Sequence, residues 1–370
     1  MKFTANRESL IKALETVEHD IENLNFWNMK EAVHLSLKDN TLTISRIGLI
    51  SGITTSIPVH ATQGGTALVS YYCLLKTLKS VKILTISVTT NKRMRLILGS
   101  TTVDIEFIDS EHYPTAFFRK QPTNNTPKCT FAGLSTQLQS VAYAQDSING
   151  TRPALSGVCF KYANKVIDIV AADGYRMAKS ALPIGKDSNF QGTVIITKMV
   201  IPAMIRLATG QSTLWVDENR VYLCTDKRTD TWIVTTPINA TFPDYPQFFS
   251  TKGHVNTIQF KTALMLEALK QVKATFPQKQ NNGNRPFIIL SLKNQTIVLT
   301  MSGDQKTAIT TSIPCTCLHK WNKFGVNIDY LIDVLKQQTA TTSIKMRKHN
   351  DPIQFSNNNS QHVLMPIYTK

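Results

Sequence analysis

The chain of 370 residues lacks the short motifs by which many nucleotide-binding proteins and hydrolases are recognised. It has no GxxxxGK[ST] loop to hold phosphates, no GxGxxG after an expected strand, and neither HExxH nor GxSxG. Asp173 and Asp244 lie beside tight turns, where a carboxylate more often caps backbone N–H groups than performs acid–base chemistry. We therefore expect no catalysis, no cofactor and no metal.

Long apolar runs and paired cysteines are also missing. The most apolar stretch, residues 194–205, is broken by Lys198 and Pro202, and no run reaches the roughly 18 residues of a membrane span. The N-terminal residues have no apolar core of the kind that marks a secretory signal. The six cysteines contain no CxxC pair, which favours reduced, mostly buried thiols in a cytosol. Cys315 and Cys317 would share one strand face, but no second Cys or His cluster completes a zinc site.

Acidic residues are scarce relative to basic ones. Lys and Arg number 41 against 25 Asp and Glu, for a formal net charge of +16. Such an excess suggests a polyanionic partner, either nucleic acid or an acidic membrane surface. A solvated surface with a lysine bias is the alternative, because charge alone does not name a ligand.

Several landmarks recur along the chain in one order and at nearly one interval. Tyr113-Pro114 is followed 129 residues later by Phe242-Pro243, and each pair leads into two consecutive phenylalanines. The other recurring landmarks are a strand ending in Phe (Phe3, Phe131, Phe260), a helix ending in Leu (Leu78, Leu207, Leu335), a polar hairpin turn (residues 38–40, 163–165, 293–295) and a following glycine (Gly48, Gly174, Gly303). A period this long indicates repeated domains and not a solenoid.

Each repeat predicts the same elements. A short strand comes first, then an amphipathic helix with apolar residues three or four apart: Leu10, Leu14, Val17; Leu134, Leu138, Val141; Leu266, Leu269, Val272. Alternating strands around polar turns predict a hairpin in each repeat, at residues 34–44, 158–169 and 289–299. A second helix is expected over residues 69–78, 198–207 and 327–335. The fold class is therefore α+β, with helices covering one face of antiparallel sheets.

Two polar, proline- or glycine-containing segments separate the repeats, at residues 119–127 and 250–254. They predict three tandem domains over residues 1–123, 124–252 and 253–370.

The motifs of the second repeat resemble a known family. Residues 151–158 (TRPALSGV) and 171–178 (AADGYRMA) are similar to the middle domain of the bacterial sliding clamp, the beta subunit of DNA polymerase III. The opening Met1-Lys2-Phe3, residues 242–245 (FPDY) and residues 363–366 (VLMP) also match that family. The resemblance covers the whole chain. It implies a head-to-tail dimeric ring with helices around a central hole that duplex DNA threads.

The helices carry cations on the side away from their apolar stripes, which agrees with that expectation. A ring of cations attracts phosphates without reading bases, as a sliding device requires. The residues expected to face DNA are Arg7, Lys12, Lys76, Lys79, Lys82, Arg152, Lys198, Arg206, Lys270, Lys273 and Lys336. A solvated helix face is the alternative for each of them.

The resemblance also implies a hydrophobic pocket between the second and third domains that takes short linear peptides. The matching positions are Leu155, Ala172, Tyr175, Met177, Pro243, Gln247, Phe248, Val363, Met365 and Tyr368. Apolar walls, a flexible Met and aromatic anchors suit peptide side chains, with ordinary core packing as the alternative. The chain departs from the family at Tyr175, which stands for a usual His, at Pro246 and Gln247, which stand for two basic residues, and at its C-terminus, which is one residue longer.

The remaining expectations concern partners. Phe107 and Ile108 in the first domain, and Thr275 and Phe276 in the third, are expected to meet across the dimer interface, with internal core as the alternative. The implied partners are double-stranded DNA, the DNA polymerase III alpha subunit, the clamp-loader complex, other polymerases and repair proteins, and a second copy of the chain, in the cytoplasm and with no membrane. The competing readings are a divergent accessory clamp, a basic DNA-binding protein that forms no ring, and an enzyme on a clamp-like scaffold.

Overall fold

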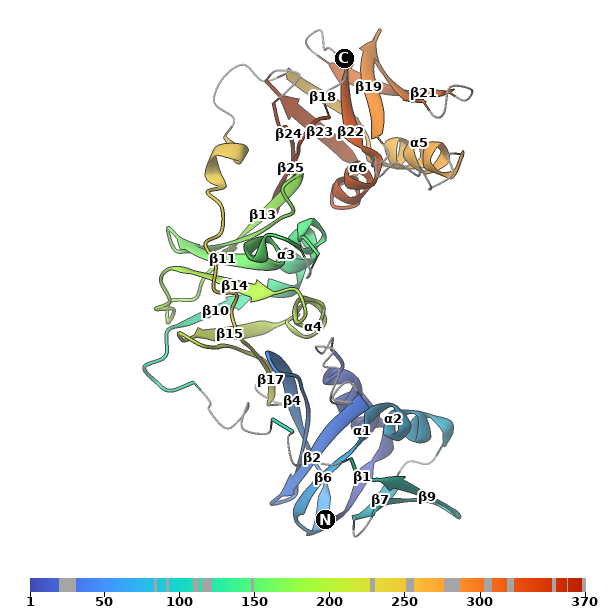
Figure 1. The fold of residues 1–370 in the computed structure, drawn as a ribbon, viewed down its shortest axis with the longest axis vertical. Helices are drawn as coiled ribbons and strands as arrows, with labels where there is room; N and C mark the ends of the chain where they lie inside the picture. The colour runs from blue at the N-terminus through green and yellow to red at the C-terminus, as the bar shows by residue number, and fades with distance from the viewer. Residues whose placement is uncertain are drawn as a thin grey trace. The chain divides into compact units, whose positions relative to one another are not determined.

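The structure is a computed structural model of the 370-residue chain. It describes residues 1–19, 31–82, 85–90, 93–108, 113–114, 122–147, 150–226, 230–250, 256–275, 287–302, 308–317, 323–347, 351–357 and 359–367. Figure 1 shows groups of strands separated by short helices along the chain.

The elements follow the order expected for three α+β repeats. Those of the first repeat are β1 (Lys2–Asn6), α1 (Arg7–Thr16), β2 (Ala32–Lys38), β3 (Thr41–Ile47), β4 (Ser51–Pro58), β5 (His60–Gln63), β6 (Gly65–Ser70), α2 (Tyr71–Ser80), β7 (Thr85–Thr90), β8 (Arg93–Leu98) and β9 (Thr101–Glu106). Those of the second are β10 (Lys128–Ala132), α3 (Leu134–Val141), η3 (Ala142–Ala144), η4 (Pro153–Leu155), β11 (Gly157–Ala163), β12 (Val166–Ala172), β13 (Arg176–Pro183), β14 (Thr193–Thr197), α4 (Ile201–Leu207), β15 (Gln211–Val216), β16 (Val221–Asp226), β17 (Thr231–Thr235) and η5 (Pro246–Phe249). Those of the third are β18 (Asn256–Lys261), α5 (Thr262–Thr275), β19 (Phe287–Lys293), β20 (Thr296–Ser302), β21 (Ala308–Cys317), β22 (Phe324–Asn327), α6 (Ile328–Leu335), β23 (Thr341–Met346), β24 (Ile353–Ser356) and β25 (Ser360–Leu364).

The predicted hairpin turns recur with the same backbone conformation. The two central residues have positive φ in all three: 46° and 61° at Asp39-Asn40, 50° and 65° at Asn164-Lys165, and 48° and 57° at Asn294-Gln295. Two successive residues with positive φ are the mark of a type I′ turn, whose twist matches that of the flanking strands. The triplication is therefore present in the backbone geometry as well as in the sequence.

The second helix of the first two repeats begins later than the sequence pattern predicts. α2 starts at Tyr71, because residue 69 still belongs to strand β6 and Ser70 caps the helix by accepting from the backbone N–H of Cys73 at 3.3 Å. α4 starts at Ile201, with Pro202 in its first turn, where a missing N–H costs nothing. In the third repeat the prediction was close, since Asn327 caps α6 through the N–H of Tyr330 at 3.0 Å.

Contacts divide the chain into two compact units. Unit 1 holds residues 1–138, 160–167 and 182–239, and unit 2 holds residues 139–159, 168–181 and 240–370.

Unit 1 joins the first two repeats through one continuous sheet. Its eight strands lie in the order β10-β15-β16-β17-β4-β3-β2-β6, and β17 pairs antiparallel with β4 through Trp232–Thr54 to Thr235–Ser51. A second, five-stranded sheet has the order β5-β1-β7-β8-β9. α1 packs on β4 and α2. The junction between these repeats is thus made by backbone hydrogen bonds as well as by side chains.

Unit 2 joins two repeats in the same way, by strand pairing. β13 pairs antiparallel with β25, from Arg176–Leu364 to Ser180–Ser360, and so joins the second repeat to the third. From β13 the sheet continues through β25-β24-β23-β18-β21-β20-β19-β22. α5 and α6 pack together, and their apolar faces bury Leu269, Val272, Leu331 and Leu335 in one cluster with the strands.

Two tyrosines anchor the segments that connect the repeats: Tyr113 of the first proline-containing landmark, and Tyr245, which follows the second. The buried Tyr113 hydroxyl accepts from the backbone N–H of Ile47 at 3.1 Å, and burial raises the pKa of that phenol. In unit 2 the Tyr245 hydroxyl donates to Asp168 Oδ2 at 2.8 Å. A tyrosine hydroxyl therefore holds each connecting segment, although the counterpart of Tyr113 in the repeat is Phe242 and not Tyr245.

Candidate functional site

An apolar pocket of about 330 Å³ lies within unit 2. The 3₁₀ turn η4, the β12–β13 turn, η5 with the segment before it, and the end of β25 build it. The lining residues are Arg152, Ala154, Leu155, Ala172, Gly174, Arg176, Met177, Thr241, Pro243, Phe248, Val363 and Met365. Met365 leaves 40% of its surface exposed, whereas Leu155 and Val363 are buried, so the pocket has fixed walls and an accessible thioether at its mouth.

The β12–β13 turn gives the pocket a narrow polar rim. Gly174 has φ of +87°, a conformation that glycine adopts without strain. A Cβ at Gly174 would lie 2.1 Å from the Arg152 guanidinium, so only glycine lets that side chain cross the turn. Arg152 donates to the carbonyl of Asp173 at 2.5 Å and lies 3.7 Å from the carboxylate of Asp146. The Asp173 carboxylate accepts from the backbone N–H groups of Tyr175 and Arg176 at 2.9 and 3.0 Å, which confirms the capping role predicted for it.

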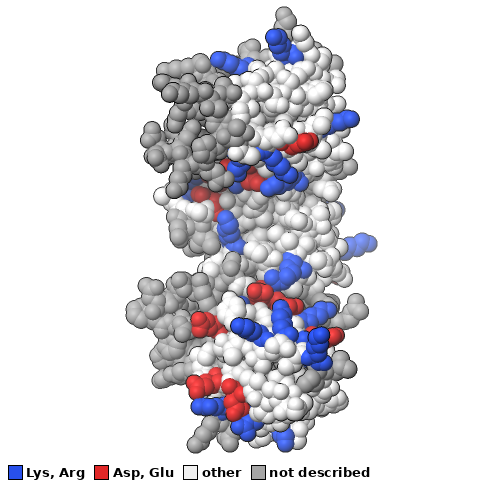
Figure 2. Space-filling model, turned by 90° about the vertical axis from the view of Figure 1, so that its right-hand side faces the viewer, with Lys and Arg blue, Asp and Glu red and all other residues white. Residues whose placement is uncertain are grey.

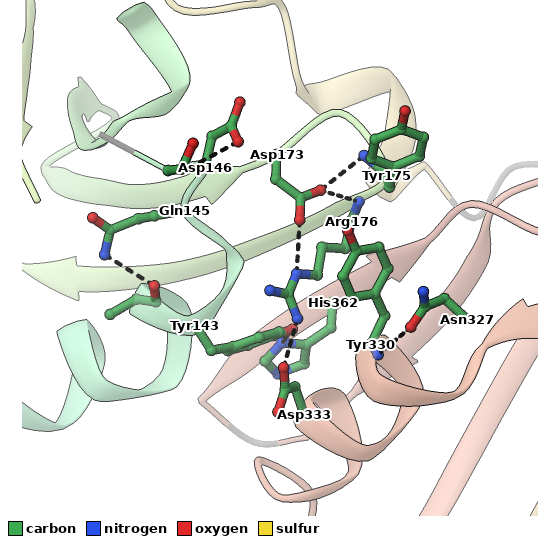
Figure 3. A network of polar contacts seen from close by, with 12 residues as sticks. Tyr143, Gln145, Asp146, Asp173, Tyr175, Arg176, Asn327, Tyr330, Asp333 and His362 are labelled. Carbon is green, nitrogen blue, oxygen red and sulfur yellow. Dashed lines mark hydrogen bonds and ion pairs between the residues drawn. The ribbon is translucent and has the colours of Figure 1, made fainter. Parts of the chain in front are cut away.

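A buried guanidinium forms part of the pocket wall. Arg176 is only 11% exposed and donates from Nε to Asp173 at 3.0 Å and from one terminal nitrogen to Asp333 at 2.7 Å. Its guanidinium carbon also lies 4.3 Å from the ring centre of Tyr330 and 5.2 Å from that of Tyr143. Figure 3 shows the guanidinium pointing between the two rings toward Asp333 on α6. Two carboxylates and two aromatic faces compensate for the lost hydration of this charge.

A buried histidine lies beside this arginine. His362 in β25 has no solvent exposure, and its two ring nitrogens lie 2.9 Å from the Tyr143 hydroxyl and 2.8 Å from the Ser360 hydroxyl. Burial lowers the pKa of His362 from 6.5 to about 4, so the ring is neutral at pH 7. Burial also raises the pKa of Tyr143, with Arg176 as an opposing influence. These neutral groups hold the back of the pocket wall in place.

Side-chain hydrogen bonds from two strands fix the segment that carries Pro243 and Phe248. The amide nitrogen of Gln354 donates to the carbonyls of Phe248 and Ser250 at 2.9 and 3.1 Å. Tyr245 donates to Asp168, and Lys179 lies 3.6 Å from the same carboxylate. Both desolvation and the bond to Asp168 raise the pKa of the Tyr245 phenol.

The structure brings together seven of the ten residues that the sequence placed in a pocket: Leu155, Ala172, Met177, Pro243, Phe248, Val363 and Met365. Tyr175 is 51% exposed and lies outside the lining, with its ring 6.4 Å from that of Tyr330. Gln247 also lies outside the lining, and its side-chain amide bonds to the carbonyl of Asp244 at 3.3 Å. Tyr368 lies outside the described residues.

Sequence reasoning missed Ala154, Gly174, Arg176 and Thr241 as lining residues, and it expected Arg152 to face DNA. The sequence does offer one signal for Arg176 as a lining residue. It is a charged residue between Tyr175 and Met177, at the start of a half-buried strand. Its partner Asp333 is 157 residues away in the chain, and no local sequence pattern predicts that ion pair.

The cations expected to face DNA lie mainly on the helices. Those that are exposed are Lys12, Lys76, Lys79, Lys82, Arg152, Arg206, Lys270 and Lys336, whereas Arg7, Lys198 and Lys273 are half-buried. On the face that Figure 2 shows, Lys and Arg side chains are interspersed with acidic ones and do not form a single block.

Some of these cations have partners within the protein. Arg7 donates to the carbonyl of Leu78 at the end of α2 at 2.8 Å, and Arg206 donates to the carbonyl of Thr16 at the end of α1 at 3.2 Å. Lys79 pairs with Glu15 at 2.7 Å. Two of the cations therefore bond helix ends, a contribution to structure that the sequence did not reveal.

The residues expected at a dimer interface are only partly described. Phe107 is 37% exposed and bridges to Val69, and Ile108 is half-buried against the core cluster around Tyr113. Thr275 ends α5, and Phe276 lies outside the described residues.

Cysteines and metal ligands add no further site. The six cysteines are free thiols, of which Cys73 is exposed, Cys315 half-buried and the others buried. In the described part of the chain no group of three His, Cys, Asp or Glu side chains is arranged to hold a metal ion. Nor does any helix within those described ranges have the length and apolar character to cross a bilayer.

Comparison with solved structures identifies the architecture. The DNA polymerase sliding clamp of Pseudomonas aeruginosa superimposes with a TM-score of 0.87 at 19% identity, covering 100% of both chains. The sliding clamp of Bacillus subtilis gives a TM-score of 0.87 at 15% identity, again over 100% of both chains. The chain therefore has the fold of the DNA polymerase sliding clamps.

Sequence comparison finds similarity to bacterial proteins. Residues 1–116 match the model of the DNA polymerase III beta subunit, N-terminal domain. The beta sliding clamp of Chlamydia pneumoniae is 26% identical over 205 residues, which span 55% of this chain and 53% of that protein. The beta sliding clamp of Escherichia coli K12 is 22% identical over 348 residues, 90% of each chain. The chain thus spans about half the length of the first curated relatives it matches, and it resembles the bacterial DNA polymerase III beta subunit.

Proposed function

We propose that this protein is a DNA sliding clamp, a processivity factor without catalytic activity. Two copies join head to tail into a ring around duplex DNA, and the apolar pocket tethers the replicative polymerase and other DNA-handling proteins. The observation that carries the proposal is the likeness to sliding clamps over the full length of the chain. The exposed helix cations support sequence-independent contact with phosphates.

The proposal extends to partners and place of action. The DNA polymerase III alpha subunit, the clamp-loader complex and repair polymerases would meet this protein in the cytoplasm. The pocket supports peptide binding, because its apolar lining and the exposed Met365 suit side chains of a short linear segment.

Retention on circular DNA tests the ring. After loading by the clamp loader and ATP onto a nicked circle, the protein should co-elute with the DNA in gel filtration. Cutting the circle once should release it, because a topological link has no hold on an open end. The control omits ATP. A protein that stays equally bound before and after the cut binds DNA without encircling it, and the ring proposal fails.

The pocket is tested by Met365→Glu. Clamps of Pseudomonas aeruginosa and Bartonella birtlesii have been solved bound to griselimycin, which therefore serves as the probe. A carboxylate in an apolar pocket would be poorly hydrated, so calorimetric affinity for griselimycin should fall by at least about 100-fold, corresponding to roughly 3 kcal/mol. Leu264→Glu is the matched control, since Leu264 is 42% exposed on α5 and Met365 is 40% exposed. Equal binding by both variants would remove the pocket assignment.

A further inference from the structure

One carboxylate on α6 holds two cations of different kinds. Asp333 Oδ2 accepts from Arg176 at 2.7 Å, and Asp333 Oδ1 lies 3.6 Å from Lys336 Nζ. Arg176 lines the pocket, and Lys336 is one of the exposed cations expected to face DNA. Asp333 therefore lies between the two surfaces on which the proposed function depends.

The two partners of Asp333 are held very differently. Arg176 is 11% exposed, and Asp173 and the rings of Tyr143 and Tyr330 also hold it (Figure 3). Lys336 is 58% exposed and pairs with Asp333 across only one helical turn. Exposed pairs of this kind contribute little free energy, so Lys336 is the partner that a phosphate can draw away.

We propose that Asp333 is a positioning residue that couples DNA contact to ligand binding in the pocket; the proposal rests on the proposed function. When a phosphate engages Lys336, the carboxylate is left to Arg176 alone and holds the guanidinium more firmly in the pocket wall. A ligand then binds a wall that is already ordered, so the side chains of the wall lose less conformational freedom on binding. Since coupling between two sites is reciprocal, the occupied pocket raises DNA affinity by the same factor.

A neighbouring ion pair provides the matched control. Lys273, also among the cations expected to face DNA, pairs with Asp329 on α6 at 2.5 Å. Asp329 lies one turn before Asp333, and neither Lys273 nor Asp329 lines the pocket. Lys273→Ala thus removes a comparable cation without touching the Asp333–Arg176 pair.

The first measurement is the affinity of griselimycin by calorimetry, with and without a short linear duplex at low salt. For the wild type, the duplex should tighten binding about threefold, as expected for loss of an exposed ion pair. Lys336→Ala should show the tighter affinity without DNA and no further change with it. Asp333→Asn should bind more weakly in both conditions. Lys273→Ala should bind DNA more weakly but, at a duplex concentration that saturates it, should keep the duplex effect on griselimycin binding. A duplex effect that survives in Lys336→Ala, or that is lost in Lys273→Ala, overturns the proposal.

The second measurement needs no pocket ligand. The Nε–H proton of Arg176, assigned by its loss in Arg176→Lys, should exchange with water more slowly when the duplex is added to the wild type. It should not respond in Lys336→Ala. If the wild type binds no griselimycin, the pocket assignment fails while this experiment still decides the coupling. An exchange rate that DNA leaves unchanged in the wild type contradicts the proposal.

Discussion

At the scale of single residues, unit 2 tolerates the nearly buried charge of Arg176 because carboxylates and aromatic rings surround it. Removing a guanidinium from water costs several kcal/mol unless ion pairs and hydrogen bonds replace its hydration. Arg176 has two carboxylates and two ring faces within reach. His362, directly behind it, meets the same requirement by remaining neutral.

The neutral state of His362 makes stability depend on pH. The folded state resists protonation down to about pH 4, whereas the unfolded chain takes up a proton near pH 6.5. The contribution is therefore fully present above pH 6.5 and is lost as the pH falls toward 4. At about 1.4 kcal/mol per pKa unit, the loss is on the order of 3 kcal/mol.

His362→Gln should reduce this loss, because glutamine can bond to Tyr143 and Ser360 but does not titrate. The measurement is the urea midpoint at pH 7 and pH 4. His19 in unit 1, whose pKa burial also lowers to about 4, contributes a loss that both proteins share. A variant that loses as much stability as the wild type would show that His362 is not responsible.

At the scale of elements, short turns decide where the functional side chains lie. The type I′ turns set the register of the hairpins, and register determines which side chains face the core. The β12–β13 turn places Arg152 over Gly174 and aligns Asp173 with Arg176. The pocket rim is thus a consequence of one glycine and one carboxylate.

Gly174→Ala tests that statement. The change should cost about 1–2 kcal/mol in unfolding free energy from the positive φ alone. The new methyl group would also push Arg152 off the carbonyl of Asp173, so griselimycin binding should change by calorimetry. Gly133→Ala is the control, because Gly133 has φ of +79° and nothing within 4 Å of the added Cβ. If the two variants bind alike, the close approach at Gly174 has no part in the pocket.

At the scale of the whole molecule, the repeats are joined by sheets that continue across their boundaries, and not only by the connecting segments. β17 pairs with β4, and β13 pairs with β25, so neither junction can open without breaking backbone hydrogen bonds. The charge of +16 suits a strongly salt-dependent contact with a polyanion.

The retention experiment requires that the chain forms a dimer in solution. Light scattering at low and moderate salt should give twice the 41.4 kDa chain mass, and a monomer at both salts would contradict the two-protomer ring.

The sequence by itself determined the features that depend on near neighbours in the chain. Helix stripes, the positive-φ turns and the triplicated order of elements follow from residues a few positions apart, and the landmarks made the repeat visible. The family motifs further located most of the pocket lining. Only the tertiary structure decided the pairing of Arg176 with Asp333, the position of Arg152 over Gly174, and the commitment of Arg7 and Arg206 to helix ends. The physical reason is that a buried charge is compensated by whichever groups the fold brings within about 3 Å, and these groups lie far apart along the chain.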